Sequence, residues 1–138
     1  MIFTRIDSTK HPMFEKCREI YCNNFPENEQ REIDEQARIL QEYPNYHLYA
    51  LSPREEKDTV LGFIAFWRFK HSYFGEHLAI DDKYKGLGYG TTAMEFLKEK
   101  SDQERVPLLL EVEPPKSEAD IKRIAFYNSL DLDINDIR

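Results

Sequence analysis

A glycine-rich loop between an apolar strand pattern and an amphipathic helix pattern constrains the fold of this chain most. Three glycines alternate with other residues in the segment Lys85–Gly90, directly after a strand predicted at Tyr73–Ile80. A helix is predicted over about Thr91–Lys100, and a short buried strand over Pro107–Val112. Strand, loop, helix and strand form a crossover connection, so these two strands are expected to be parallel.

The remaining segments supply further strands and helices. Val60–Arg68 is apolar at nearly every position, which is typical of a strand covered on both faces. Two further strands are expected upstream, at Met1–Ile6 and at Tyr46–Leu51, and the second pairs with Val60–Arg68 by a hairpin. Two helices are expected between them. The first opens at Pro12 and has Phe14, Cys17 and Tyr21 on one face, and the second runs over about Asn28–Leu40 with Ile33, Ala37 and Leu40 at helical spacing.

A helix over about Glu118–Leu130, capped by Ser117, is predicted to follow the last strand. The order of elements is therefore β-α-α-β-β-β-α-β-α. We predict an α+β fold of three layers, in which a twisted, mixed and mostly antiparallel sheet is flanked by helices. One domain is expected to span residues 1–138.

The composition supports a folded chain and argues against two classes of partner. Hydrophobic residues make up 41% of the chain, and no apolar run approaches the ~20 residues of a membrane span. The net charge of −7 argues against nucleic acid, because phosphates favour a basic surface. The N-terminal segment lacks the apolar stretch of a secretory signal. We therefore expect a soluble, cytoplasmic protein that binds neither nucleic acid nor membrane.

Two cysteines, Cys17 and Cys22, lie close together without forming a metal-binding pattern. Five helical positions at ~100° each turn their side chains well apart around the axis. No further Cys, Glu or His set completes a zinc-like spacing. We expect reduced structural thiols and no metal.

The glycine loop has the composition of an anion site. Glycines let backbone N–H groups approach a ligand without interference from Cβ, and the following helix adds unpaired N–H groups and the positive end of its dipole. Lys85 adds a nearby positive charge. Together these groups suit a pyrophosphate. A turn without a ligand stays open as the alternative, because glycine is also an ordinary turn residue.

Two other phosphate-binding loops do not match this segment. The dinucleotide-binding pattern Gly-x-Gly-x-x-Gly would need its last glycine at Thr91 or Ala93. A Walker A loop places Lys and Ser or Thr after its glycines, whereas Lys85 precedes them.

The loop and its surroundings resemble the GNAT superfamily of N-acetyltransferases. The coenzyme A signature of that family is Arg/Gln-x-x-Gly-x-Gly/Ala after the fourth strand, and Lys85–Gly90 reads Lys-Gly-Leu-Gly-Tyr-Gly. Upstream, Glu76–Ile80 resembles the strand before the signature. Downstream, Ala125–Leu130 resembles the Phe-Tyr segment on the last helix of the family. The order of elements also matches, and the resemblance covers nearly the whole chain.

The resemblance implies acetyl-coenzyme A as cosubstrate and a gap between the strand ending at Ile80 and the strand at Pro107–Val112. The pantetheine arm would enter that gap, and the pyrophosphate would lie on the loop amides. The coenzyme-binding residues so implied are Leu78, Ala79, Ile80, Lys85, Gly86, Leu87, Gly88, Tyr89, Gly90 and Thr91.

Several positions depart from the family pattern. Lys85 would favour phosphate as a point charge, without the fork of Arg. Asp120 stands where the family usually has Asn, and Leu130-Asp131-Leu132 replaces Leu-Gly-Phe. The chain also ends at Arg138, before two strands typical of the family. We therefore expect either a truncated chain or a sheet edge completed by another chain, for example in a homodimer.

The activity implied is transfer of an acetyl group to a primary amine by direct attack. An alkylammonium with a pKa near 10.4 must first lose a proton. Glu76 is the predicted base, directly or through a water, on the argument that partial burial raises its pKa. A solvated carboxylate is the alternative. His77 ranks below it because strand alternation points it to the opposite face.

The remaining roles are also carried by the resemblance. Backbone N–H near Leu78 would stabilise the developing oxyanion, and Tyr127 would donate a proton to the leaving thiolate. Tyr127 as a packing aromatic is the alternative. Candidate acceptor-binding residues are Phe25, Glu29, Trp67, Tyr73 and Glu111, with ordinary core or surface roles as the alternative.

The acceptor amine, small molecule or peptide, is not identified by the sequence. Two other functions stay open. One is a non-catalytic or truncated acetyl-CoA-binding member of the family, favoured by the altered last helix and the early end. The other is an interaction module that completes its sheet with a partner strand.

Overall fold

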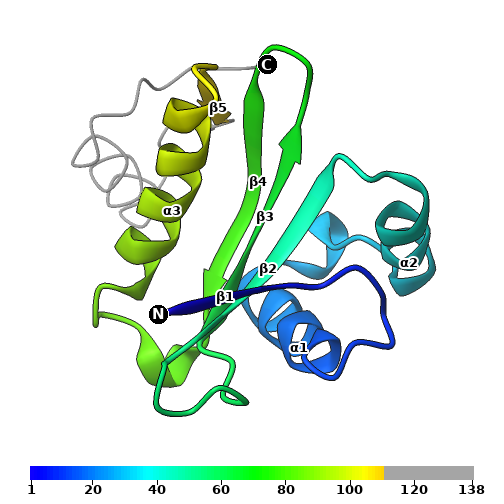
Figure 1. Ribbon diagram of the computed structural model, residues 1–138. Helices are drawn as coiled ribbons and strands as arrows, with labels where there is room; N and C mark the ends of the chain where they lie inside the picture. The colour runs from blue at the N-terminus through cyan, green and yellow to red at the C-terminus, as the bar shows by residue number, and fades with distance from the viewer. Residues whose placement is uncertain (111–138) are drawn as a thin grey trace.

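The computed structural model describes residues 1–110, and residues 111–138 lie outside the description (Figure 1). The helix predicted over Glu118–Leu130 and the end of the strand predicted at Pro107–Val112 therefore cannot be compared. The elements, in chain order, are β1 (Ile2–Arg5), α1 (Phe14–Asn24), the 3₁₀ turn η1 (Glu27–Glu29), α2 (Ile33–Glu42), β2 (Tyr46–Ser52), β3 (Gly62–Arg68), β4 (Tyr73–Ile80), the 3₁₀ turn η2 (Asp82–Tyr84), α3 (Tyr89–Gln103) and β5 (Leu108–Leu110).

The five described strands form one sheet in the order β1-β2-β3-β4-β5. The first three pairs are antiparallel, and β4 pairs with β5 in parallel. The hairpin between β2 and β3 and the crossover through α3 are therefore confirmed. The mostly antiparallel α+β fold is confirmed with them.

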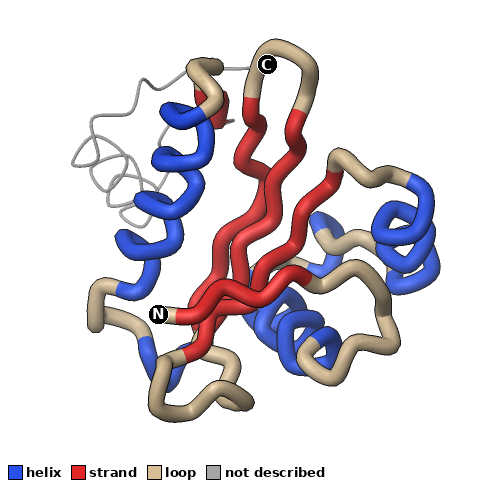
Figure 2. Tube along the Cα trace, viewed as in Figure 1, coloured by secondary structure: helices blue, strands red, loops and turns tan. Residues whose placement is uncertain are grey.

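Helices cover both faces of the sheet (Figure 2). On one face α1 and α2 pack on a core that includes Phe14, Ile20 and Leu48. On the other face α3 buries Met94 and Leu97. The predicted buried strand is confirmed, since residues 62–66 of β3 are buried without exception. Burial of apolar area on both faces is the main favourable term that holds the layers together.

The predicted start of the second helix is wrong, and of the three residues predicted at helical spacing Ile33 is exposed while Leu40 packs against the core. α2 begins at Ile33, and residues 27–29 form only a single 3₁₀ turn. The side chain of Gln30 donates to the carbonyl oxygens of Cys22 and Phe25, which fixes an extended connection before the helix. The buried residues of α2 are Gln36 and Ile39, whereas Ile33 is half exposed.

A β-bulge lies in the middle of β4. Ala65 of β3 pairs with His77, and the next residue, Phe66, pairs with Gly75, so Glu76 is an extra residue in β4. Such a bulge interrupts the alternation of side chains along a strand. Glu76 and His77 consequently both face α1 and α2. The prediction that they point to opposite faces is wrong for this reason.

β4 pairs with β5 along the whole described length of β5. Tyr73, Phe74 and Gly75 are opposite Leu108, Leu109 and Leu110, the last residues that the structure describes. Gly75 permits the close approach, because a Cβ there would lie 2.6 Å from a methyl group of Leu110. The predicted gap between these two strands involves residues outside the description and stays a prediction.

A polar cluster ties the end of α3 to the hairpin between β3 and β4. Glu104, directly after α3, accepts a hydrogen bond from the Tyr73 hydroxyl and pairs with Arg68, whose Nε lies 3.1 Å from its Oε1. The Arg68 guanidinium also lies 5.0 Å from the centre of the Tyr73 ring. This cluster holds together the end of the molecule at which β4 and β5 are paired.

Substitution of Gly62 by Ala tests the register of β3 against β4. A Cβ at this position would lie 2.4 Å from the backbone oxygen of Ala79, which cannot move aside as a flexible side chain would. We expect Gly62→Ala to lower the free energy of unfolding by about 3 kcal/mol, the upper end of typical overpacking costs. Chemical denaturation measures this, with Glu55→Ala in an exposed turn as the control. Unchanged stability of Gly62→Ala would contradict the register.

Candidate functional site

The loop before α3 has the backbone conformation that its glycines make accessible. Gly86 and Gly88 have φ values of +80° and +87°, in the left-handed region that other residues rarely adopt. Gly88 is the N-cap of α3, so the first N–H groups of this helix emerge directly beside the loop. A ligand can therefore approach the main chain closely here.

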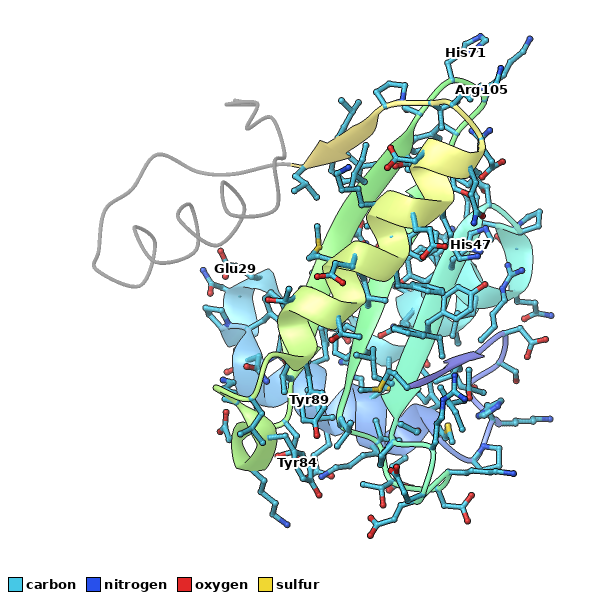
Figure 3. The ribbon with its side chains drawn as sticks, turned by 60° about the vertical axis from the view of Figure 1, so that its left-hand side comes forward. Glu29, His47, His71, Tyr84, Tyr89 and Arg105 are labelled. Atoms are coloured by element: carbon cyan, nitrogen blue, oxygen red, sulfur yellow. The ribbon has the colours of Figure 1, made fainter. Side chains whose placement is uncertain are left out.

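A cleft of about 480 Å³, which we call the loop cleft, lies at this helix N-terminus. Figure 3 shows Tyr84 and Tyr89 close to the start of α3. The residues that line the cleft are Asn24, Leu78, Ala79, Ile80, Tyr84, Lys85, Gly86, Gly88, Tyr89, Gly90 and Thr91. Every coenzyme-binding residue predicted from the sequence is among them except Leu87, which is exposed. The predicted residues are thus brought together around one cleft.

Asn24 and Tyr84 line the loop cleft without having been predicted. The Lys85 Nζ donates to Asn24 Oδ1 at 2.8 Å and lies 2.7 Å from Asp82 Oδ1. Asn24 stands at the end of α1, 61 residues before Lys85, and nothing in its sequence surroundings signals this contact. The Lys85 side chain, although 52% exposed, is thereby linked to the end of α1 and to the turn before the loop.

A second, small cavity continues from the loop cleft at Leu78. This inner pocket, of about 40 Å³, is lined by Ile64, Gly75, Glu76, His77, Leu78, Met94, Leu97 and Leu110. It combines residues of β3, β4, α3 and β5 beside the paired residues Gly75 and Leu110. Since Leu78 lines both spaces, the two cavities follow one another along β4.

A third cavity lies on the side of α1 and α2. This polar cleft, of about 260 Å³, is lined by Tyr21, Asn28, Glu29, Gln30, Arg31, Glu35, Glu76 and His77. Glu76 and His77 line both the polar cleft and the inner pocket. The two residues of the bulge therefore stand between the two cavities.

Glu76 is bound by three donors. Arg31 Nη1 and Nη2 donate to its two oxygens at 3.0 and 3.2 Å, and Trp67 Nε1 donates to Oε2 at 3.1 Å. Burial alone would raise the pKa of Glu76, but the hydrogen bonds from His77 and Arg31 and the guanidinium charge outweigh it and lower the pKa to about 2. The expectation of a raised pKa is therefore wrong, because the sequence does not reveal Arg31.

His77 stands beside this carboxylate. Its Nδ1 lies 3.3 Å from Glu76 Oε1, and its ring packs edge-on against Tyr21 and Phe25, with ring centres 5.2 and 5.0 Å away. The side chain is 18% exposed. Sequence reasoning ranked this residue low because alternation without a bulge would have turned it away.

The predicted acceptor-binding residues divide into three groups. Glu29 lines the polar cleft, while Phe25 and Trp67 contact His77 and Glu76. Tyr73 is buried on the face covered by α3, with its hydroxyl bound to Glu104, so it is not brought together with them. Glu111 and Tyr127 lie outside the described residues.

Within residues 1–110, no cluster of His, Cys, Asp and Glu could hold a metal ion. In the same part of the chain, no helix has the length and apolar character needed to cross a membrane.

The geometry of loop and clefts can be compared with known proteins. The model of the acetyltransferase (GNAT) family matches residues 14–131. Comparison with curated proteins gives no significant match.

Solved structures share the fold. A putative GNAT-family acetyltransferase from Bacteroides thetaiotaomicron has 28% identity and a TM-score of 0.81, over 94% of this chain and 70% of its own. The ribosomal-protein-S18-alanine N-acetyltransferase of Escherichia coli has 20% identity and a TM-score of 0.68, over 94% and 75%. An aminoglycoside 6'-N-acetyltransferase complexed with coenzyme A has 16% identity and a TM-score of 0.61, over 80% and 61%. Because the family model covers most of the sequence, the chain belongs to the GNAT family of acetyltransferases.

Proposed function

We propose that the protein is an acetyl-CoA-dependent N-acetyltransferase that acts on a primary amine by direct attack of the amine on the thioester. The observation that carries this proposal is the chain of cavities along β4. The loop cleft, the inner pocket and the polar cleft adjoin one another through Leu78 and then through Glu76 and His77. An extended thioester and an amine can thus approach one point from two sides.

The loop cleft has the groups that a diphosphate needs. The amides around Gly86 and Gly88, the N-terminus of α3 and the ammonium of Lys85 supply donors and positive charge. The residues of β4 from Leu78 to Ile80 would hold the pantetheine arm, because they line the loop cleft beside the proposed diphosphate site. The thioester would then enter the inner pocket.

The acceptor would approach through the polar cleft. Glu29 and Glu35 line it, and their carboxylates favour a cationic amine. The amine must lose a proton before its lone pair can attack the carbonyl carbon. A carbon–nitrogen bond then forms, the carbon–sulfur bond breaks, and the thiolate takes up a proton.

The proton for the thiolate is assigned to Tyr127, on the resemblance of Ala125–Leu130 to the Phe-Tyr segment of the family. A phenol can donate a hydrogen bond to sulfur and is restored by exchange with water. Backbone N–H near Leu78 is assigned to the oxyanion on the resemblance to the family, and Leu78 lines both the loop cleft and the inner pocket.

Substitution of Gly88 by Val tests the coenzyme site. Val has no comfortable conformation at a φ of +87°, and its side chain would stand beside the amides proposed to bind diphosphate. We expect acetyl-CoA affinity, measured by titration calorimetry, to fall at least about 100-fold, the equivalent of roughly 2.7 kcal/mol. The control variant Leu87→Ala, at an exposed neighbouring position, should bind acetyl-CoA with wild-type affinity. Unchanged affinity in a folded Gly88→Val would contradict the assignment.

Substitution of Tyr127 by Phe tests the leaving-group role. Loss of a general acid typically costs about 100-fold or more in rate, so kcat should fall by that factor. The dissociation constant of acetyl-CoA should stay near the wild-type value, because only one hydroxyl is removed. An equal loss of coenzyme binding would instead show that Tyr127 has a structural role.

A further inference from the structure

We propose that His77 accepts the proton of the acceptor amine and that Glu76 is a positioning residue that holds the imidazole. This proposal rests on the proposed function and assigns the base within the same site. It replaces the prediction in which Glu76 itself removes the proton.

The position of His77 meets the first requirement of a base, access to both reactants. The residue lines the polar cleft, where an amine would arrive, and also the inner pocket, where the thioester would lie. The bulge at Glu76 turns the imidazole toward α1, where it packs against Tyr21. The side chain remains 18% exposed, so a proton taken from the amine can leave to solvent.

The carboxylate of Glu76 is already occupied. Its Oε1 accepts from Arg31 Nη1, and its Oε2 accepts from both Arg31 Nη2 and Trp67 Nε1. A carboxylate held by charge-assisted hydrogen bonds is a weak proton acceptor. It is well suited, however, to hold a neighbouring ring.

The imidazole is oriented by that carboxylate. Because a carboxylate only accepts hydrogen bonds, the nitrogen that faces Glu76 at 3.3 Å, Nδ1, is best the protonated one. The Nε2 then carries the lone pair. Tyr21 and Phe25 pack against the ring and limit its rotation.

Charged and titratable groups surround His77 from each packed element. Glu76 lies beside it on β4, and Tyr21 faces it from α1. Glu29 and Arg31 line the polar cleft from the segment before α2, and Glu35 lines it from α2 itself. Arg31 is paired with Glu76, with Nη1 3.0 Å from Oε1.

The proton transfer balances as follows. The Nε2 lone pair takes one proton from the ammonium, and the nitrogen–hydrogen electron pair remains on the amine. The amine attacks the thioester carbon and loses a second proton after the carbon–nitrogen bond has formed. The departing sulfur gains one proton, and the imidazolium returns its proton to water.

The pH dependence of kcat/KM, measured at saturating acetyl-CoA between about pH 5 and 9, separates the candidates. With His77 as the base, kcat/KM falls toward acidic pH and the profile has an acidic limb, because only a neutral imidazole can accept a proton. Glu76, with its pKa near 2, gives none. The profile is measured with two acceptors whose amines differ in pKa. An acidic limb caused by protonation of the amine shifts with the pKa of the amine, whereas a limb caused by a group of the protein stays at the same pH.

Two histidine variants complete the test. In His77→Gln, kcat/KM at pH 8 should fall at least about 100-fold, and the acidic limb that does not depend on the acceptor should vanish. In a second variant, His77→Ala, added imidazole should restore part of the rate. His71→Gln is the matched control, since His71 is exposed at the tip of the β3–β4 hairpin (Figure 3). It should retain the wild-type rate and limb.

Other outcomes overturn the proposal. If His77→Gln has the wild-type rate and the wild-type acidic limb, His77 is not the base. A Glu76→Gln variant that loses activity completely, while His77→Gln retains it, returns the role to the carboxylate. Coenzyme affinity of each variant is measured in parallel. A wild-type protein that binds acetyl-CoA but acetylates no amine refutes the proposed function and this assignment with it.

Discussion

One additional residue in β4 determines where the groups of this site lie. The bulge at Glu76 brings two consecutive side chains to the same face of the sheet, where both residues line the polar cleft. Arg31 and Trp67 can therefore bind the carboxylate while Tyr21 packs against the neighbouring imidazole. With regular alternation, Glu76 and His77 would face opposite sides of the sheet, and only one of the two could line the polar cleft.

Much of the fold could be predicted because it rests on local signals. Apolar runs mark β3, helical spacing marks α1, and a loop of alternating glycines between strand and helix requires a parallel crossover. The coenzyme loop is one continuous segment, so nine of its ten predicted contacts line the same cleft and only Leu87 points outward. In short segments of this kind, the local sequence largely determines the backbone conformation.

The polar contacts of the site could not be predicted, because they join residues that are distant in the sequence. Arg31 reaches Glu76 across 45 residues, and Lys85 reaches Asn24 across 61. Neither partner stands out by type or spacing. The same applies to the start of α2, where side-chain bonds of Gln30 override a helical pattern. The direction of the pKa shift of Glu76 depends on such a distant partner, which explains why burial alone gave the opposite sign.

The cluster of Tyr73, Arg68 and Glu104 has a mechanical consequence. It fastens one end of α3 to the sheet, at the end where β4 and β5 are paired. At the other end, the first turn of α3 follows two left-handed glycines in an open loop. We therefore expect any displacement of α3 on ligand binding to be largest at its first turn, beside the loop cleft.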